Sequence, residues 1–226
     1  MKVVATSDLH GSLPSIPECD LLIIAGDVCP DFIRSNRKVG LNGPDKGEQR
    51  QANWLRTTFN PWLAEQPAEQ IVGIAGNHDF VFEHRFLLPK GPPLKWVYLQ
   101  DSLAEIQGLR IYGLPWVPNL PFWAFHARAE ALAAAYEAVP PCDVLLSHGP
   151  PLDYGDKCGP KYGMEGLAVG AVEARFAIER CKPMFFINGH IHEGYGEYEH
   201  AGCRILNVAH NDASYSPVNP PVEVEL

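Results

Sequence analysis

Residues 184–196 read MFFINGHIHEGYG, an apolar run that stops at a glycine and continues into two histidines. Met184 to Ile187 have the composition of a buried strand, and side chains two positions apart on an extended chain point to the same side. The side chains of His190 and His192 are therefore predicted to point to the same side of the chain. An isolated H-x-H is also compatible with a surface turn, so the rest of the chain must decide between a turn and a site.

The same arrangement occurs at five places along the chain. Short runs of Val, Ile, Leu, Ala and Phe each end in polar or metal-binding residues: KVVATSDLH (2–10), DLLIIAGD (20–27), IVGIAGNHD (71–79), DVLLSHG (143–149) and MFFINGHIH (184–192). Apolar runs without alternation are typical of strands that are covered on both faces. Since ligands of open α/β sheets bind at the carboxyl ends of the strands, the five polar ends are predicted to form one site.

The segments between these runs predict the rest of the fold. Helical periodicity is present in residues 48–65, 126–139 and 168–181, and in the last of these Val169, Val172 and Phe176 define the apolar face. Strands that alternate with helices indicate a layered α/β fold. Four further segments look like a β-meander and predict a second sheet: 95–99, 109–114, 203–208 and 222–226.

We therefore expect one domain, residues 1–226, built as an α/β sandwich of two mixed β-sheets flanked by α-helices. Three stretches without clear periodicity, 31–47, 115–125 and 150–166, are expected to be long loops around the site.

Composition and charge limit the classes of partner. The chain has 226 residues, of which 46% are hydrophobic and 20% charged, as in an ordinary globular protein. Its net charge of −9 argues against a stable nucleic-acid partner. The start lacks the apolar core of a signal peptide, and no stretch approaches the ~18 to 20 apolar residues of a membrane span. We expect a cytoplasmic protein without a membrane partner, whose six scattered cysteines are mostly buried packing residues.

The polar strand ends supply the donor groups of a metal site. They carry imidazole, carboxylate and carboxamide groups: Asp8, His10, Asp27, Asn77, His78, Asp79, His148, His190 and His192. This donor set suits Mn²⁺, Fe or Zn²⁺ better than Ca²⁺. Because it contains too many ligands for one ion, we predict two divalent metal ions that share a carboxylate, about 3.5 to 4 Å apart.

The motifs D-L-H, G-D, G-N-H-D, H-G and G-H-I-H, in this order, resemble the motif set of the calcineurin-like metallophosphoesterases. Further stretches resemble the MPPED (metallophosphoesterase-domain-containing) subfamily: VYLQDS (97–102), RIYGLPW (110–116), SHGPPL (147–152), GHIHEGYG (189–196) and NPP (219–221). The resemblance spans nearly the whole chain and implies the metallophosphoesterase-type sandwich. It departs chiefly in the loops 31–47 and 153–166, which leaves the choice of substrate open.

The resemblance also implies a role for each motif residue. The first ion would be held by four residues: Asp8, His10, Asp27 and His192. The second ion would share Asp27 and add three more: Asn77, His148 and His190. Mn²⁺ is the first candidate for both ions, with Fe and Zn²⁺ as alternatives. His78 would be a catalytic residue near the leaving group, and Asp79 would orient it.

The implied activity is metal-dependent phosphoester hydrolysis by in-line attack of a metal-bridging hydroxide, without a covalent phosphoenzyme. The expected substrate is a small or nucleotide-like phosphodiester, with cyclic nucleotides among the candidates. The aromatic side chains Trp116, Phe122 and Trp123 are expected either to stack on a base or to pack within their loop. The alternative functions are a phosphomonoesterase or protein phosphatase, and a binding protein that keeps the metals without turnover.

Overall fold

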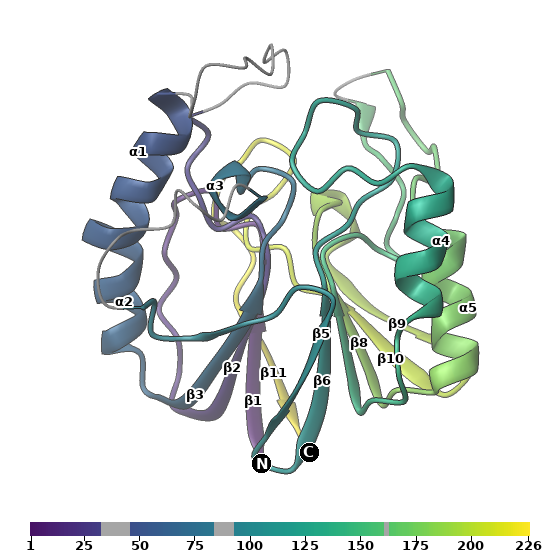
Figure 1. The fold of residues 1–226 in the computed structure, drawn as a ribbon, viewed down its shortest axis with the longest axis horizontal. Coiled ribbons are helices and arrows are strands. Elements are labelled where there is room, and N and C mark those ends of the chain that lie inside the picture. Colours follow the sequence, from purple (N-terminus) through teal and green to yellow (C-terminus); the bar gives the residue numbers. More distant parts are fainter. Residues whose placement is uncertain (33–45, 84–92, 161–162) are drawn as a thin grey trace.

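The structure, a computed structural model, describes residues 1–32, 46–83, 93–160 and 163–226 (Figure 1). Most of the loop 31–47 and the centre of the loop 153–166 therefore lie outside the described residues. Within the described ranges, none of the helices has the length and apolar character that a bilayer crossing requires.

The first sheet has five strands in the order β11-β1-β2-β3-β4. Four of them run parallel, namely β1 (Lys2–Thr6), β2 (Cys19–Ala25), β3 (Ala68–Ile74) and β4 (Val97–Tyr98). The last strand of the chain, β11 (Val222–Glu225), pairs antiparallel with β1 and closes one edge of the sheet.

The second sheet has six strands in the order β5-β6-β7-β8-β10-β9. Its four central strands run parallel: β6 (Leu109–Leu114), β7 (Val144–Ser147), β8 (Phe185–Asn188) and β10 (Cys203–Asn207). The edge strands β5 (Ser102–Ile106) and β9 (Gly196–His200) pair antiparallel with their neighbours. Both sheets are therefore mixed, as predicted.

The two sheets pack face to face, and helices cover their outer faces (Figure 1). Alternate side chains of each strand enter different cores: Val3 and Ala5 of β1 lie between the sheets, whereas Val4 packs outward. A continuous helical stretch made of α1 (Lys46–Trp54), the π-helical turn η1 (Leu55–Phe59) and α2 (Asn60–Glu65) lies on the outer side of the first sheet, where Leu55, Phe59 and Leu63 enter the core. The short α3 (Phe80–Glu83) packs on the same side.

Helices α4 (Ala129–Glu137) and α5 (Val172–Cys181) cover the outer face of the second sheet (Figure 1). They confirm two predicted helices with shorter bounds. The predicted inner face of the last helix is wrong, because Val172 is 37% and Phe176 59% exposed. Small residues face the sheet instead, with Ala174 and Ala177 beside Ile178, which lets the helix approach the strands closely.

The segments predicted to form a β-meander are strands, but they do not form one. Residues 95–99 and 222–226 contribute β4 and β11 to the first sheet, while β6 and β10 lie in the second sheet, parallel to β7 and β8. The apolar runs are also divided, three in the first sheet and two in the second. The two-sheet α/β sandwich itself is confirmed.

Candidate metal centre

The carboxyl ends of strands from both sheets meet at one edge of the sandwich and carry the predicted ligands. In the part of the chain that the structure describes, three groups of side chains have ligand atoms within 4.8 Å of one another: Asp8–His10–His192, His10–Asp27–His78 and Asp27–His148–His190. Because His10 and Asp27 each belong to two groups, the three groups form one continuous centre.

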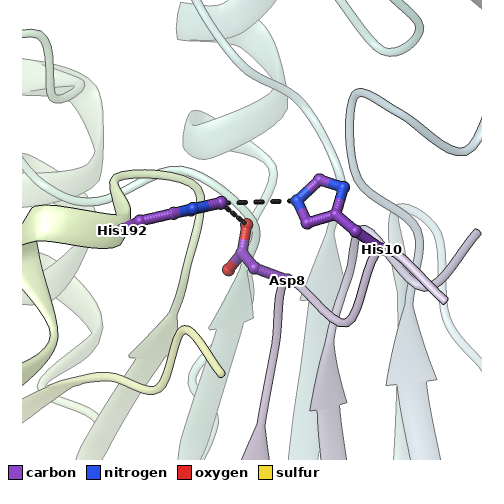
Figure 2. Close-up of side chains that lie close together, drawn as sticks. All are labelled: Asp8, His10 and His192. Atoms are coloured by element: carbon purple, nitrogen blue, oxygen red, sulfur yellow. Dashed lines mark hydrogen bonds and ion pairs between the residues drawn. The ribbon is translucent and has the colours of Figure 1, made fainter. Parts of the chain in front are cut away.

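The first triad joins the ends of β1 and β8 (Figure 2). His192 Nε2 lies 3.3 Å from Asp8 Oδ1 and 3.3 Å from His10 Nε2. The backbone N–H of His190 donates to both oxygens of Asp8, at 3.1 and 2.9 Å. The segment after β8 is therefore joined to the segment after β1 by side-chain and main-chain contacts.

Asp27 lies between the first triad and the remaining ligands. Its Oδ2 is 3.3 Å from His148 Nε2 and 3.9 Å from His10 Nε2, and its Oδ1 accepts the backbone N–H of His78 at 2.7 Å. His148 Nε2 also lies 3.0 Å from Asn77 Oδ1. This central place is what a bridging carboxylate requires.

The imidazoles of His148 and His192 are each held by a backbone carbonyl, so that Nε2 faces the carboxylates of the centre. His148 Nδ1 donates to the carbonyl of Ala25 at 2.8 Å, and His192 Nδ1 donates to the carbonyl of Asp212 at 2.8 Å. A backbone acceptor at Nδ1 places the lone pair of the neutral ring on Nε2, the atom that faces the carboxylates. With the buried carboxylates beside them, these residues fit a pair of divalent ions.

The backbone of the centre is strained at several of the candidate ligands. Asp8, His10, Asp27 and His190 have φ values of 53°, 45°, 51° and 70°, in the left-handed region that residues with a Cβ rarely adopt. Such conformations cost of order 1 to 3 kcal/mol each and gather at functional sites. Gly76 and Gly189 allow the close packing, because a Cβ at either position would collide with Asp27 or Asp8.

Burial and the mutual proximity of these groups shift their pKa values. Burial opposes ionisation of Asp27, but the nearby imidazoles, His148 foremost, outweigh it and hold the pKa of this carboxyl well below its usual range. Burial also disfavours charge on His148 and His192, yet contact with Asp27 and Asp8 respectively raises each pKa to about 9. Burial together with the charge of His148 lowers the pKa of His190 to about 3.

The expectation that Asp79 orients His78 is corrected by the structure. The carboxylate that contacts the His78 ring belongs to Asp31, whose Oδ1 lies 2.5 Å from His78 Nδ1 and 3.4 Å from His10 Nδ1. Asp79 instead accepts the backbone N–H groups of Val28, Cys29 and Gly76 at 3.1, 2.8 and 2.9 Å. Its carboxylate is used to fasten the loops after β2 and β3 to each other.

Aromatic rings surround the imidazoles. The ring centroid of Trp123 lies 4.3 Å from that of His78, and Phe122 beside it is 70% exposed. Trp116 has a different use, since it packs against Phe125 at 5.5 Å and donates to Asp101 at 2.7 Å. Tyr215, which the sequence analysis did not single out, lies with its ring 4.7 Å from that of His10.

The sequence profile of the family described as calcineurin-like phosphoesterase matches residues 1–194, a region that includes every predicted ligand. The chain belongs to this family. Among its relatives, the human metallophosphoesterase domain-containing protein 1 is 32% identical over 253 aligned positions, which cover 100% of this chain and 71% of the human protein. A UPF0046 protein of Caenorhabditis elegans is 30% identical, with 100% of this chain and 60% of the relative covered.

A solved structure supports the same fold for this calcineurin-like phosphoesterase. The phosphopantetheinyl hydrolase of Mycobacterium tuberculosis superposes with a TM-score of 0.61 at 16% identity, over 98% of this chain and 95% of that one. At this identity the likeness concerns the fold alone.

Proposed function

We propose that the chain is a phosphodiesterase that depends on two divalent metal ions and hydrolyses a small or nucleotide-like phosphodiester. The observation that carries the proposal is the central place of Asp27, between the triad Asp8–His10–His192 and the pair His148 and His190. Membership of a phosphoesterase family supports it, since a pair of bound ions would supply Lewis acidity and lower the pKa of water.

The proposal divides the candidate ligands between the two ions. Asp8, His10 and His192 would hold one ion, and Asn77, His148 and His190 the other, with Asp27 between them. Most of these side chains are buried and His10 and His190 are half-buried, which limits their movement when charge develops on a phosphoryl group. Preorganised charge of this kind is the main means by which phosphoryl transfer is accelerated.

His78 is the residue that we propose to protonate the leaving oxygen. Its Nε2 faces the centre, 4.0 Å from Asp27 Oδ2, while Asp31 holds its Nδ1. Burial disfavours the charged form, but Asp27 and Asp31 outweigh it and raise the pKa of His78 above its ordinary value. A protonated imidazole can therefore donate from Nε2 near neutral pH, when the ester oxygen departs.

The preference for a diester with a planar substituent rests on Trp123. Its ring lies against His78, beside the exposed Phe122, so a base or aryl group bound at the leaving-group side would meet aromatic surface. Stacking of this kind contributes about 1 to 3 kcal/mol per base.

A substrate and metal screen tests the proposal. Metal-free protein is reconstituted with Mn²⁺, Zn²⁺, Ni²⁺ or Mg²⁺ and assayed on bis-p-nitrophenyl phosphate, p-nitrophenyl phosphate, and 2′,3′- and 3′,5′-cyclic nucleotides. We expect close to two ions per chain and faster turnover of diesters than of the monoester. Asp27→Asn is the matched inactive control. Full activity without metal, or hydrolysis confined to the monoester, would refute the proposal.

A further inference from the structure

The turn formed by residues 212–216 lies beside the first triad and is built around one carboxylate. Asp212 Oδ1 accepts the backbone N–H groups of Ser214 and Ser216, at 2.8 and 3.0 Å, and the hydroxyl of Ser214 at 2.6 Å. Two main-chain bonds close the turn, from Tyr215 N to Asp212 O at 2.8 Å and from Asp212 N to Ser216 O at 2.9 Å. These five hydrogen bonds hold the turn in one conformation.

This turn holds Tyr215 in a conformation that an aromatic residue rarely adopts. Its φ is 64°, in the left-handed region that glycine favours. A residue persists in this conformation only when the surrounding structure holds it, and such residues cluster at active sites and ligand-binding sites. Here the effect is to place the half-buried ring against two imidazoles of the first triad, 4.7 Å from His10 and 5.1 Å from His192, with interplanar angles of 65° and 66°.

The same turn also contacts the first triad through its backbone. The carbonyl of Asp212 accepts the N–H of His192 Nδ1 at 2.8 Å. One short segment therefore fixes the proton position of His192 and limits the ring rotation of both His10 and His192. His148, which would bind the other ion, is oriented by a different segment, because its Nδ1 donates to the carbonyl of Ala25 at the end of β2.

We propose that the turn 212–216 is a positioning element for one metal site only: Asp212 and Tyr215 orient His10 and His192, and thereby set the affinity of the Asp8–His10–His192 triad for its divalent ion. The proposal rests on the two-metal assignment of the proposed function. It assigns Tyr215 a support role toward ligands, not a contact with substrate. Residues that orient metal-ligating histidines typically change metal affinity about 10- to 100-fold when they are removed.

The test measures metal binding rather than turnover. Tyr215→Gly removes the ring while keeping a residue that adopts φ 64° without strain, so loss of the ring is separated from loss of the turn. Tyr215→Phe keeps the ring, and Asp212→Ala removes the carboxylate that builds the turn. Phe176→Ala is the control, since it removes an exposed aromatic ring from α5, on the outer face of the second sheet.

Mn²⁺ titrations, followed by calorimetry and electron paramagnetic resonance, give the two dissociation constants and the spin coupling of the ion pair. We expect Tyr215→Gly and Asp212→Ala to raise one dissociation constant about 10- to 100-fold and leave the other unchanged. The coupled signal should give way to that of an isolated ion at low Mn²⁺. Tyr215→Phe and Phe176→Ala should bind both ions like the wild type.

If Tyr215→Gly binds both ions as tightly as the wild type and only its KM is higher, the proposal is overturned. Tyr215 would then line the substrate site and would not position metal ligands. Equal weakening of both ions would also overturn it, because the effect would then be general. The proposed function is judged separately. A wild-type protein that binds two ions without hydrolysing any ester would refute the function, while the difference between the two dissociation constants would still test the turn.

Discussion

Asp31→Asn is the substitution that tests most directly how His78 works. The Asp31 carboxylate contacts His78 Nδ1 and lies close to His10 Nδ1, with its side chain 42% exposed at the mouth of the centre. Replacing it with the neutral amide keeps the size of the side chain and removes the charge. The substitution should therefore lower the proton affinity of His78 without disturbing the packing around it.

The size of the effect follows from the hydrogen bond that is lost. A hydrogen bond to a charged group is worth about 1.5 to 3 kcal/mol, which corresponds to a factor of roughly 10 to 100 in an equilibrium constant. Partial exposure of Asp31 to solvent favours the lower end of this range. Because the contact raises the pKa of His78, its removal should move the alkaline limb of the kcat–pH profile to lower pH.

The assay compares two leaving groups at saturating metal across pH 6 to 10. A poor leaving group, such as the ribose alkoxide of a nucleotide diester, needs the proton of His78, and its kcat should fall about 10-fold or more at pH 8. Release of p-nitrophenolate needs no proton and should change far less. Asp153→Asn, which removes a carboxylate paired with Arg175 away from the centre, is the matched control. An equal loss for both leaving groups, with no shift of the alkaline limb, would refute the acid role of His78.

Three further predictions concern the ions and the rim of the site. Asp27→Ala should lower metal content and kcat more than His192→Ala, because Asp27 lies between both sets of ligands; retention of two ions in Asp27→Ala would contradict its bridging place. Metal binding at pH 7.5 should release up to about two protons, since the pKa values of His148 and His192 are raised to about 9 and ligation needs the neutral rings; calorimetry in buffers of different ionisation enthalpy measures this number. Trp123→Ala should raise KM for a nucleotide substrate by a factor equivalent to about 1 to 3 kcal/mol, and equal losses with a small aryl ester would mean that the ring only packs on His78.

The strands that could be predicted from the sequence are those buried on both faces, because burial there requires apolar residues at successive positions. In β2, Leu21 and Ile23 enter the core between the sheets while Leu22 and Ile24 pack beneath the helices, so the run has no polar break until Asp27. The edge strands β5 and β9 went unpredicted for the opposite reason. Their sequences, SLAEI and GEYEH, alternate between partly buried and exposed residues, a pattern that turns and loops also show.

The candidate ligands could be named from the strand ends, but the contacts between these residues and their supports could not. Asp31 follows Asp27 closely in sequence, and nothing in GDVCPD indicates which carboxylate turns toward His78. Asp79 stands directly after His78, yet its side chain points toward the backbone of another loop. Adjacent residues on a turn diverge, so sequence proximity is a poor guide to which side chain touches an imidazole.

The glycines that precede the ligands explain how strands of two sheets can present their ends to one point. An extended chain would carry Asp27 and His190 onward along the strand direction, away from the facing sheet. At the end of β2, Gly26 has a φ of 99° and Asp27 a φ of 51°, so two consecutive left-handed residues turn the chain sharply. The turn brings the carboxylate over the sheet edge instead of beyond it. Glycine itself would adopt this conformation without strain at position 27, but it has no side chain to bind an ion. The strain at Asp8, His10, Asp27 and His190 therefore falls on residues that form the turn and also carry the side chains proposed to bind the ions.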